Sequence, residues 1–130
     1  MTQKVLVIDD DVEFSTAVIT VLQTKGYAVF SASNGKDGFA KAQEGKVDLI
    51  LLDVMMTRKT EGFDVARQLK SHPSTSHIPV IIITGIRKEF NLPFGFEADD
   101  QWLPVRAVLE KPVKPETLLK TIEDILQQPK

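Results

Sequence analysis

Short, uninterrupted apolar runs alternate along this chain with segments whose apolar residues recur at helical spacing. Such runs stand at 5–8, 49–52 and 80–83. Strands that are apolar on both sides are typical of parallel sheets covered by helices on both faces. Because the crossover connections between parallel strands are right-handed, few topologies remain. This alternation predicts an α/β fold with a doubly wound, five-stranded parallel sheet.

The expected strands are bounded by turn-forming or polar residues, and they cover 5–8, 27–31, 47–52, 80–83 and 105–109. The expected helices cover 12–25, 36–43 and 64–70, and a last one begins at Pro115. The second helix is expected to turn Phe39, Ala40 and Ala42 inward. Asp11 is expected to cap the first helix and Gly26 to end it, and Asn34-Gly35 predicts a turn.

Composition excludes several classes of function. The chain has 130 residues, a usual size for one domain, and a formal net charge of −2, so it has no basic field for holding nucleic acid. It has no cysteine, which excludes disulfides and thiolate chemistry. The apolar run that follows Lys4 is too short for a signal peptide or a membrane span. We therefore expect a cytoplasmic protein without membrane insertion or direct contact with nucleic acid.

Polar residues follow four of the expected strands directly. Asp9-Asp10-Asp11 follows the first strand, Asp53 the third, Thr84 the fourth, and Lys111 comes just after the fifth. In open parallel sheets, ligands bind at the carboxyl ends of the strands. Taken singly, each residue has a plainer interpretation as a solvated loop, turn or surface residue. Their joint placement at one sheet edge favours a functional site.

The chemistry of these residue types suits phosphoryl transfer with a divalent cation. Asp9, Asp10 and Asp53 would place three carboxylates in one pocket, where like charges repel. An oxygen-rich, acidic site of this kind suits Mg²⁺, which can also neutralise charge on a phosphoryl group. A carboxylate is a known nucleophile that gives an aspartyl phosphate. Thr84 and Lys111 can contact phosphoryl oxygens.

The sequence resembles the receiver domains of two-component response regulators, including the single-domain chemotaxis type. The resemblance runs along nearly the whole chain, and it is carried by the motifs at 5–11, 53–56, 83–85 and 111–112. It implies a flavodoxin-like fold with sheet order 2-1-3-4-5. It also implies that Asp53 is the phosphoacceptor, that Asp10, Asp53 and the Met55 carbonyl bind Mg²⁺ directly, and that Asp9 acts mainly through water.

The resemblance further implies that Thr84 and Lys111 contact the phosphoryl group. The donor would be a histidine kinase or a histidine phosphotransfer protein, and phosphorylation would switch a protein–protein contact surface. Such a domain is not an enzyme beyond its own phosphorylation and dephosphorylation. Residues 1–130 are expected to form one receiver domain without an output domain. Apolar Met55 and Ile86, at positions that influence loss of phosphate in this family, predict slow self-dephosphorylation.

The chain departs from the family pattern in three places. Thr57 stands where many receivers have proline, in a loop that is expected to be one residue longer than usual. Val108 occupies the position of the usual aromatic switch residue, which leaves open how phosphorylation is transmitted. The segment Phe90–Pro104 is long and aromatic. It is either a partner surface, in which case the 86–110 region is a candidate dimer interface, or a lid over the chain's own core.

Two other classes of function are alternatives to this interpretation. A phosphorylation-independent scaffold with a receiver-like fold is one alternative. The other is a cofactor binder or a small phosphatase on a similar sheet. A flavodoxin would need a loop rich in Ser, Thr and Gly after the first strand, where Asp9-Asp10-Asp11 would repel a phosphate. A phosphatase with its nucleophile at Asp9 would leave Asp53 without a role.

Overall fold

The computed structural model describes residues 3–45, 47–53, 61–84, 107–110 and 113–127. Within these residues the chain alternates between strands and helices, as the apolar runs predict. The strands are β1 (Lys4–Ile8), β2 (Ala28–Ala32), β3 (Leu49–Asp53), β4 (Val80–Thr84) and β5 (Ala107–Glu110). The helices are α1 (Val12–Thr24), α2 (Gly35–Gly45), α3 (Glu61–Ser71) and α4 (Pro115–Gln127).

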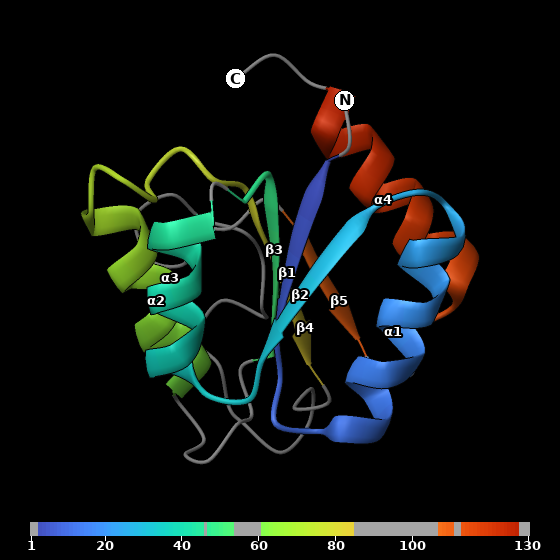
Figure 1. Ribbon diagram of the computed structural model, residues 1–130, viewed down its shortest axis with the longest axis horizontal. Helices are drawn as coiled ribbons and strands as arrows, with labels where there is room; N and C mark the ends of the chain where they lie inside the picture. The colour runs from blue at the N-terminus through green and yellow to red at the C-terminus, as the bar shows by residue number, and fades with distance from the viewer. Residues whose placement is uncertain (1–2, 46, 54–60, 85–106, 111–112, 128–130) are drawn as a thin grey trace.

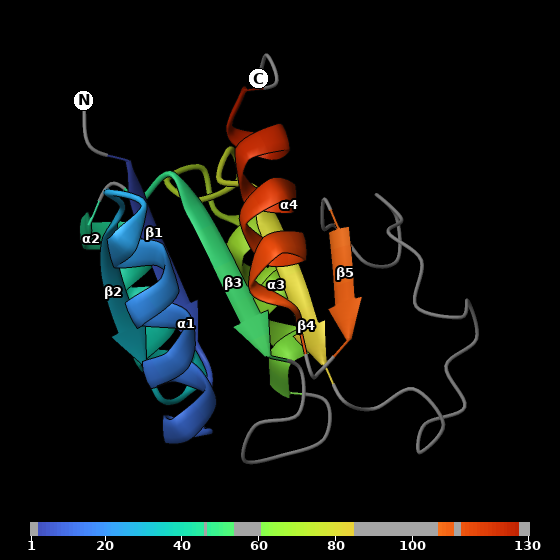
Figure 2. The same ribbon diagram turned by 90° about the vertical axis from the view of Figure 1, so that its right-hand side faces the viewer.

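The strands form one parallel sheet in the order β2-β1-β3-β4-β5, which confirms the predicted order. Their arrows run in the same direction, so their carboxyl ends meet at one edge of the sheet (Figure 2). Strand β3 lies at the centre, between β1 and β4. The register aligns Ile8 of β1 with Leu52 of β3, and Asp53 of β3 with Ile83 of β4. Side chains at the carboxyl end of β3 therefore have neighbours from β1 on one side and from β4 on the other.

Helices cover both faces of the sheet, with α1 and α4 on one side and α2 and α3 on the other (Figure 1). Strand β1 shows how its apolar run serves both layers. Val5 and Val7 pack in the α1/α4 layer, whereas Leu6 and Ile8 pack in the α2/α3 layer. None of the four is more than 1% exposed. This confirms that an unbroken apolar run marks a strand buried on both faces.

The predicted ends of helix α1 are confirmed. Asp11 is its N-cap, and the Asp11 carboxylate accepts a hydrogen bond of 3.1 Å from the Phe14 backbone N–H. Gly26 follows the last turn with φ of +88°, a left-handed conformation that disfavours residues with a β-carbon. A cap at one end and a glycine at the other therefore delimit this helix.

Two predictions about α2 are wrong. Asn34-Gly35 is not a free turn but the start of the helix, because the Asn34 side chain accepts a 2.8 Å hydrogen bond from the Asp37 N–H and so caps it. Ala40 is exposed rather than inward. The buried face of α2 contains Gly35, Gly38 and Ala42, and positions at that spacing leave Ala40 on the other side.

Other boundaries differ from the prediction by one to a few residues, since hydrogen bonding rather than apolarity decides where a strand starts. At β3 the predicted start at Val47 moves to Leu49. Before it, the Asp48 N–H donates to the Lys4 carbonyl at 2.9 Å, and the Lys4 N–H donates to the Asp48 carboxylate at 2.7 Å. These bonds tie the beginnings of β1 and β3 together.

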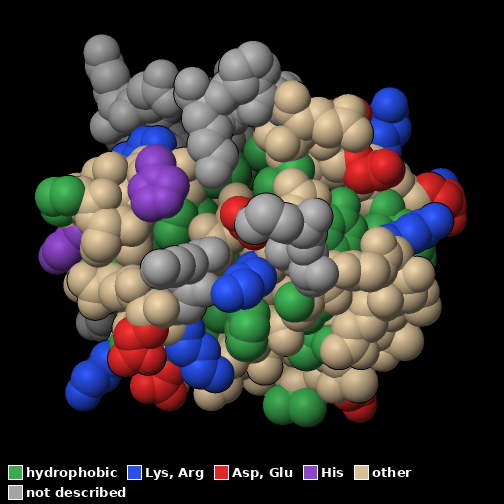
Figure 3. Space-filling view, turned by 45° about the horizontal axis from the view of Figure 1, so that its top comes forward, with side chains coloured by type: hydrophobic (Ala, Val, Ile, Leu, Met, Phe, Trp, Pro, Cys, Tyr) green, Lys and Arg blue, Asp and Glu red, His purple; other side chains and the backbone are tan. Residues whose placement is uncertain are grey.

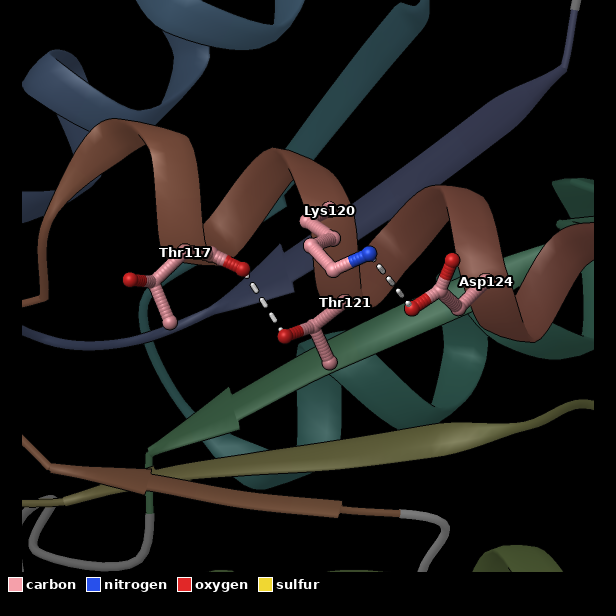
Figure 4. A network of polar contacts seen from close by, with 4 residues as sticks. All are labelled: Thr117, Lys120, Thr121 and Asp124. Carbon is pink, nitrogen blue, oxygen red and sulfur yellow. Dashed lines mark hydrogen bonds and ion pairs between the residues drawn. The ribbon is translucent and has the colours of Figure 1, made fainter.

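Helix α4 begins at Pro115 and buries Leu118, Ile122 and Ile125, as its apolar stripe predicts. Its outer side carries contacts between residues one turn apart (Figure 4). The Thr121 hydroxyl donates to the Thr117 carbonyl at 2.8 Å, and Lys120 lies 3.8 Å from Asp124. Because this ion pair is highly exposed it contributes little stability. The apolar stripe therefore holds α4 on the sheet.

Strand β2 is an edge strand, and one of its outward carbonyls is covered. The Lys41 ammonium of α2 donates a hydrogen bond to the Ser31 carbonyl. Unpaired edge groups otherwise offer a template for pairing with another chain. Lys41 therefore protects this part of the edge.

No helix among the described residues is long and apolar enough to cross a membrane. Toward the end at which the strands begin, acidic and basic side chains are interspersed over the surface (Figure 3).

Replacing Thr75 with Val is expected to destabilise the protein by about 1–3 kcal/mol. Thr75 is 1% exposed, and its hydroxyl donates a 2.5 Å hydrogen bond to the Leu69 carbonyl in the last turn of α3. Pro73 has no N–H to donate to that carbonyl, so the Val variant leaves the acceptor unsatisfied. Urea unfolding measures the change. Thr75→Ser retains the hydroxyl and should lose less; a Val variant as stable as wild type would contradict this account.

Candidate metal centre

Two acidic residues lie side by side at the carboxyl edge because of the sheet register. Ile8 is the last residue of β1 and is aligned with Leu52 of β3. The next residues along the two strands are Asp9 and Asp53. Strands that are aligned and parallel keep successive residues adjacent, so the register itself brings these two carboxylates together.

Asp10 completes a cluster with Asp9 and Asp53. One carboxylate oxygen from each residue lies within 4.8 Å of the others. Asp9 is 4% exposed and Asp53 is 3% exposed, whereas Asp10 faces solvent. Two buried carboxylates and one at the surface therefore form a site that is open on one side.

The Asp9 carboxylate is held by the turn that starts α1. The Asp11 N–H donates a 2.8 Å hydrogen bond to Asp9 Oδ1. The Asp9 N–H donates to the Ala32 carbonyl at 3.0 Å and so extends the pairing of β1 with β2 by one residue. Because Asp11 also caps α1, the helix start and the position of the Asp9 carboxylate depend on the same turn.

This donor set fits a small divalent cation. Magnesium prefers carboxylate oxygens and water, and it requires a regular octahedral arrangement. Two side chains fixed by burial and one open to solvent supply carboxylate oxygens while leaving room for water. A bound divalent ion would also offset the repulsion among three negative charges within 4.8 Å.

The other predicted site residues are only partly described. Thr84 is the last residue of β4 and follows Ile83, which is aligned with Asp53, so its backbone lies at the same sheet edge. Val108 is within β5, and its backbone is aligned with Ile82. Met55 and Lys111 lie outside the described residues. So do Thr57, Ile86, the segment Phe90–Pro104 and most of the 86–110 region.

A buried hydroxyl beside the cluster was not predicted. Ser15 in α1 is 8% exposed, and its hydroxyl lies 3.5 Å from the Asp9 carbonyl as a long hydrogen bond. The spacing of Ser15 from Val18 and Leu22 places it on the buried face of the helix, and this periodicity was the available signal. Ser15, Asp9 and Lys41 are among the residues that line a cleft of about 300 Å³ next to the cluster.

Comparison with known proteins assigns the family. The chain matches the response regulator receiver domain over residues 5–123, and it belongs to this family. The protein PilH of Pseudomonas aeruginosa is 37% identical over 123 residues, which cover 95% of this chain and 97% of PilH. Two transcriptional regulatory proteins of Bacillus subtilis are matched over only 48% and 50% of their own length.

Solved structures agree with this assignment. The chemotaxis response regulator CheY4 of Vibrio cholerae has a TM-score of 0.82 and 30% sequence identity, covering 96% of this chain and 99% of CheY4. The receiver domain of the sensor histidine kinase PA1611 from Pseudomonas aeruginosa has a TM-score of 0.80 and 19% identity, covering 98% and 100%. At that identity it shows the fold alone. Its structure has a magnesium ion coordinated in the active site cleft.

The chain is therefore a phosphoacceptor receiver of two-component signalling, and a signalling domain rather than a classical enzyme. Receiver domains in general bind Mg²⁺ in an acidic site and interact with histidine kinases or phosphotransfer proteins. That residues 1–130 form one receiver without an output domain stays a prediction, as does the cytoplasmic location.

Proposed function

We propose that Asp53 accepts the phosphoryl group, with Mg²⁺ held by Asp9, Asp10, Asp53 and the Met55 carbonyl. The observation that supports this most is the cluster of three carboxylates, whose oxygens lie within 4.8 Å of one another at the carboxyl edge of the sheet. In our proposal, Thr84 and Lys111 contact the transferred group from the side of β4 and β5.

The position of Asp53 favours it over the other two acids as the phosphoacceptor. Asp53 ends the central strand β3, so a group attached to it can reach residues of β1 on one side and β4 on the other. Asp9 follows β1, which lies between β2 and β3 and is therefore one strand further from β4 and Thr84. Asp10 is at the surface and lies beyond the end of β1. It can hold a cation there, but it is not flanked by a strand on each side as Asp53 is.

The transfer requires little beyond positioning and charge stabilisation. An Asp53 carboxylate oxygen forms a bond to phosphorus while the bond from phosphorus to the donor's imidazole nitrogen breaks. The electron pair of the broken bond stays on the imidazole, which takes up a proton. Magnesium, when bound, supplies positive charge that offsets the negative charge of the phosphoryl oxygens. Asp9 and Asp10 hold that charge beside Asp53.

Partners follow from the same chemistry. In our proposal the donor is a histidine kinase or a histidine phosphotransfer protein, and the phosphorylated domain changes its contacts with a downstream protein. The domain also catalyses its own phosphorylation by small acyl phosphates and its own dephosphorylation. Apolar Met55 and Ile86 cannot orient a water molecule by hydrogen bonding, so we expect the phosphorylated form to be long-lived.

Incubation with a small acyl phosphate and Mg²⁺ is expected to add one phosphoryl group to the wild-type protein and none to Asp53→Asn. Intact-protein mass spectrometry measures the adduct. Excess chelator should abolish it, because the metal-free cluster repels the approaching phosphate. Asp48→Asn is the matched control: it removes an aspartate next to the same strand, at the end of β3 away from the cluster, and should retain the adduct.

Two results would contradict this assignment. An adduct that persists in Asp53→Asn would move the phosphoacceptor to another residue. No adduct in folded wild-type protein with Mg²⁺ would favour a scaffold that binds its partners regardless of phosphate.

A further inference from the structure

Helix α2 approaches strand β1 more closely at Gly38 than a residue with a β-carbon would allow. A β-carbon added at Gly38 would lie 2.5 Å from Ile8 Cδ1, 2.7 Å from Cγ1 and 3.0 Å from Cγ2. Carbon atoms in van der Waals contact are about 3.5–4.0 Å apart. The overlap therefore involves three atoms of Ile8, including both branches at its β-carbon, rather than only the flexible tip.

The Ile8 side chain cannot move far to relieve this overlap. Its side chain is 0% exposed and packs in the same layer as Leu52 and Ala32. These two residues are also its partners in register on the neighbouring strands β3 and β2. A β-branched side chain has few rotamers, and a close-packed interior transmits displacement. Steric overlap between a β-carbon at position 38 and the Ile8 side chain would therefore displace the end of β1.

Helix α2 is also restrained at this end of the sheet. The Asp37 N–H donates to Asn34 Oδ1 at 2.8 Å, the Asn34 side-chain amide donates to Asp37 Oδ2 at 3.0 Å, and the Gly38 N–H donates to the Asn34 carbonyl at 3.0 Å. Lys41 connects the helix to the Ser31 carbonyl of β2. The first three bonds fix the first turn of α2, whereas the Lys41 bond and the short connection from the end of β2 at Ala32 resist retreat of that turn from the sheet, so the displacement is shared with β1.

The residues that follow Ile8 are those of the acidic cluster. Asp9 comes next and is bonded through its N–H to the Ala32 carbonyl at 3.0 Å, and Asp10 follows it. Asp53 is on a different strand, so movement of the end of β1 changes the separation between Asp53 and the other two carboxylates. Magnesium tolerates little departure from oxygen distances of about 2.0–2.1 Å, so a small shift would weaken binding.

We propose that Gly38 is a positioning residue for the metal centre: the missing side chain lets α2 and Ile8 pack so that Asp9 and Asp10 meet Asp53 in a geometry that holds Mg²⁺. This inference rests on the proposed function, because it requires that the cluster binds Mg²⁺. Gly38 itself does not contact the metal. It acts through the volume that it leaves to Ile8.

The test is Mg²⁺ affinity, measured by isothermal titration calorimetry on wild type, Gly38→Ala, Ile8→Val and the double variant. Gly38→Ala is expected to weaken binding by roughly tenfold or more, the range seen when groups that orient metal ligands are changed. Ile8→Val removes Cδ1, so the double variant restores the total volume and should recover much of the affinity. The amide resonances of Asp9 and Asp10 should shift in Gly38→Ala and return toward wild type in the double variant.

Val80→Ala separates positioning from general loss of stability. Val80 is 3% exposed and packs in the same layer, but it begins β4 at the far end of the sheet. It should lower stability and leave Mg²⁺ affinity unchanged. If Val80→Ala weakens binding as much as Gly38→Ala does, or if folded Gly38→Ala binds like wild type, the inference is wrong.

If Gly38→Ala does not fold, the Mg²⁺ affinity of the double variant tests the inference instead. Affinity near that of wild type supports the volume coupling, and affinity well below that of both wild type and Ile8→Val overturns it. A wild-type protein that does not bind Mg²⁺ would instead overturn the proposed function.

Discussion

Asp10→Asn is expected to weaken Mg²⁺ binding by at least roughly thirtyfold and, at the same time, to make the metal-free protein more stable. The two effects have opposite signs because Asp10 interacts with two kinds of charge. It attracts a divalent cation, and it repels Asp9 and Asp53, whose oxygens lie within 4.8 Å. Removal of its charge loses the attraction and relieves the repulsion.

Coulomb's law sets the size of both effects. A unit charge about 4 Å from a divalent ion gains about 2 kcal/mol even at the dielectric constant of water, which corresponds to roughly thirtyfold in affinity. Two like unit charges at that distance repel by about 1 kcal/mol in water. Asp10 is exposed, so the value for water applies to it better than the larger values for the protein interior.

Calorimetry gives the Mg²⁺ affinity, and urea unfolding with and without Mg²⁺ gives the stability. The matched control is Asp11→Asn. Asp11 is the third acid of the same run, but its carboxylate caps α1 by accepting from the Phe14 N–H, and Asn caps helices equally well. It should change Mg²⁺ affinity far less. Equal losses in Asp10→Asn and Asp11→Asn would mean that overall negative charge, rather than the cluster, attracts the ion.

Ile82→Ala is expected to destabilise the protein by about 2–5 kcal/mol. Ile82 is 0% exposed in β4, where it packs in the α2/α3 layer and is aligned with Leu52 and Val108. The loss combines the apolar surface that is no longer buried with the cavity that remains, because a strand held on both sides can collapse only in part. Urea unfolding measures the free energy of unfolding.

Two matched variants test whether burial is the cause. Ile82→Val removes only one methylene and should lose about 0.5–1.5 kcal/mol. Val12→Ala also shortens a β-branched residue, but Val12 is 72% exposed, so its stability should stay within about 0.5 kcal/mol of wild type. A loss at Val12 similar to that at Ile82 would contradict the assignment of the core.

The fold class could be predicted because the signals for it are local. An unbroken apolar run such as Val5-Leu6-Val7-Ile8 can satisfy both faces only in a strand covered on both sides, and this is where it lies. Asp11 caps α1 and Pro115 begins α4 for reasons contained within one helical turn. The family motifs then supplied the sheet order, which the structure confirms.

Local sequence patterns did not predict features that depend on contacts between separate segments of the chain. Apolarity predicts an inward Ala40, but the face of α2 that packs on the sheet contains Gly38, which lies against Ile8, and Ala40 is exposed. No local pattern predicts that Thr75 closes the end of α3. Its hydroxyl donates to the Leu69 carbonyl, six residues earlier in the chain, and only the folded turn brings the two groups together. Both outcomes depend on packing and hydrogen bonding between segments.

The candidate site shows the same division. The positions of the acidic residues after β1 and β3 can be read from the chain order, since each directly follows an apolar run. Folding brings carboxylate oxygens of Asp9, Asp10 and Asp53 within 4.8 Å of one another, buries Asp9 and Asp53, and leaves Asp10 exposed, and no local pattern indicates these three outcomes. Convergence requires the register of β1 with β3, and that register is set by packing and hydrogen bonding between strands far apart in the chain.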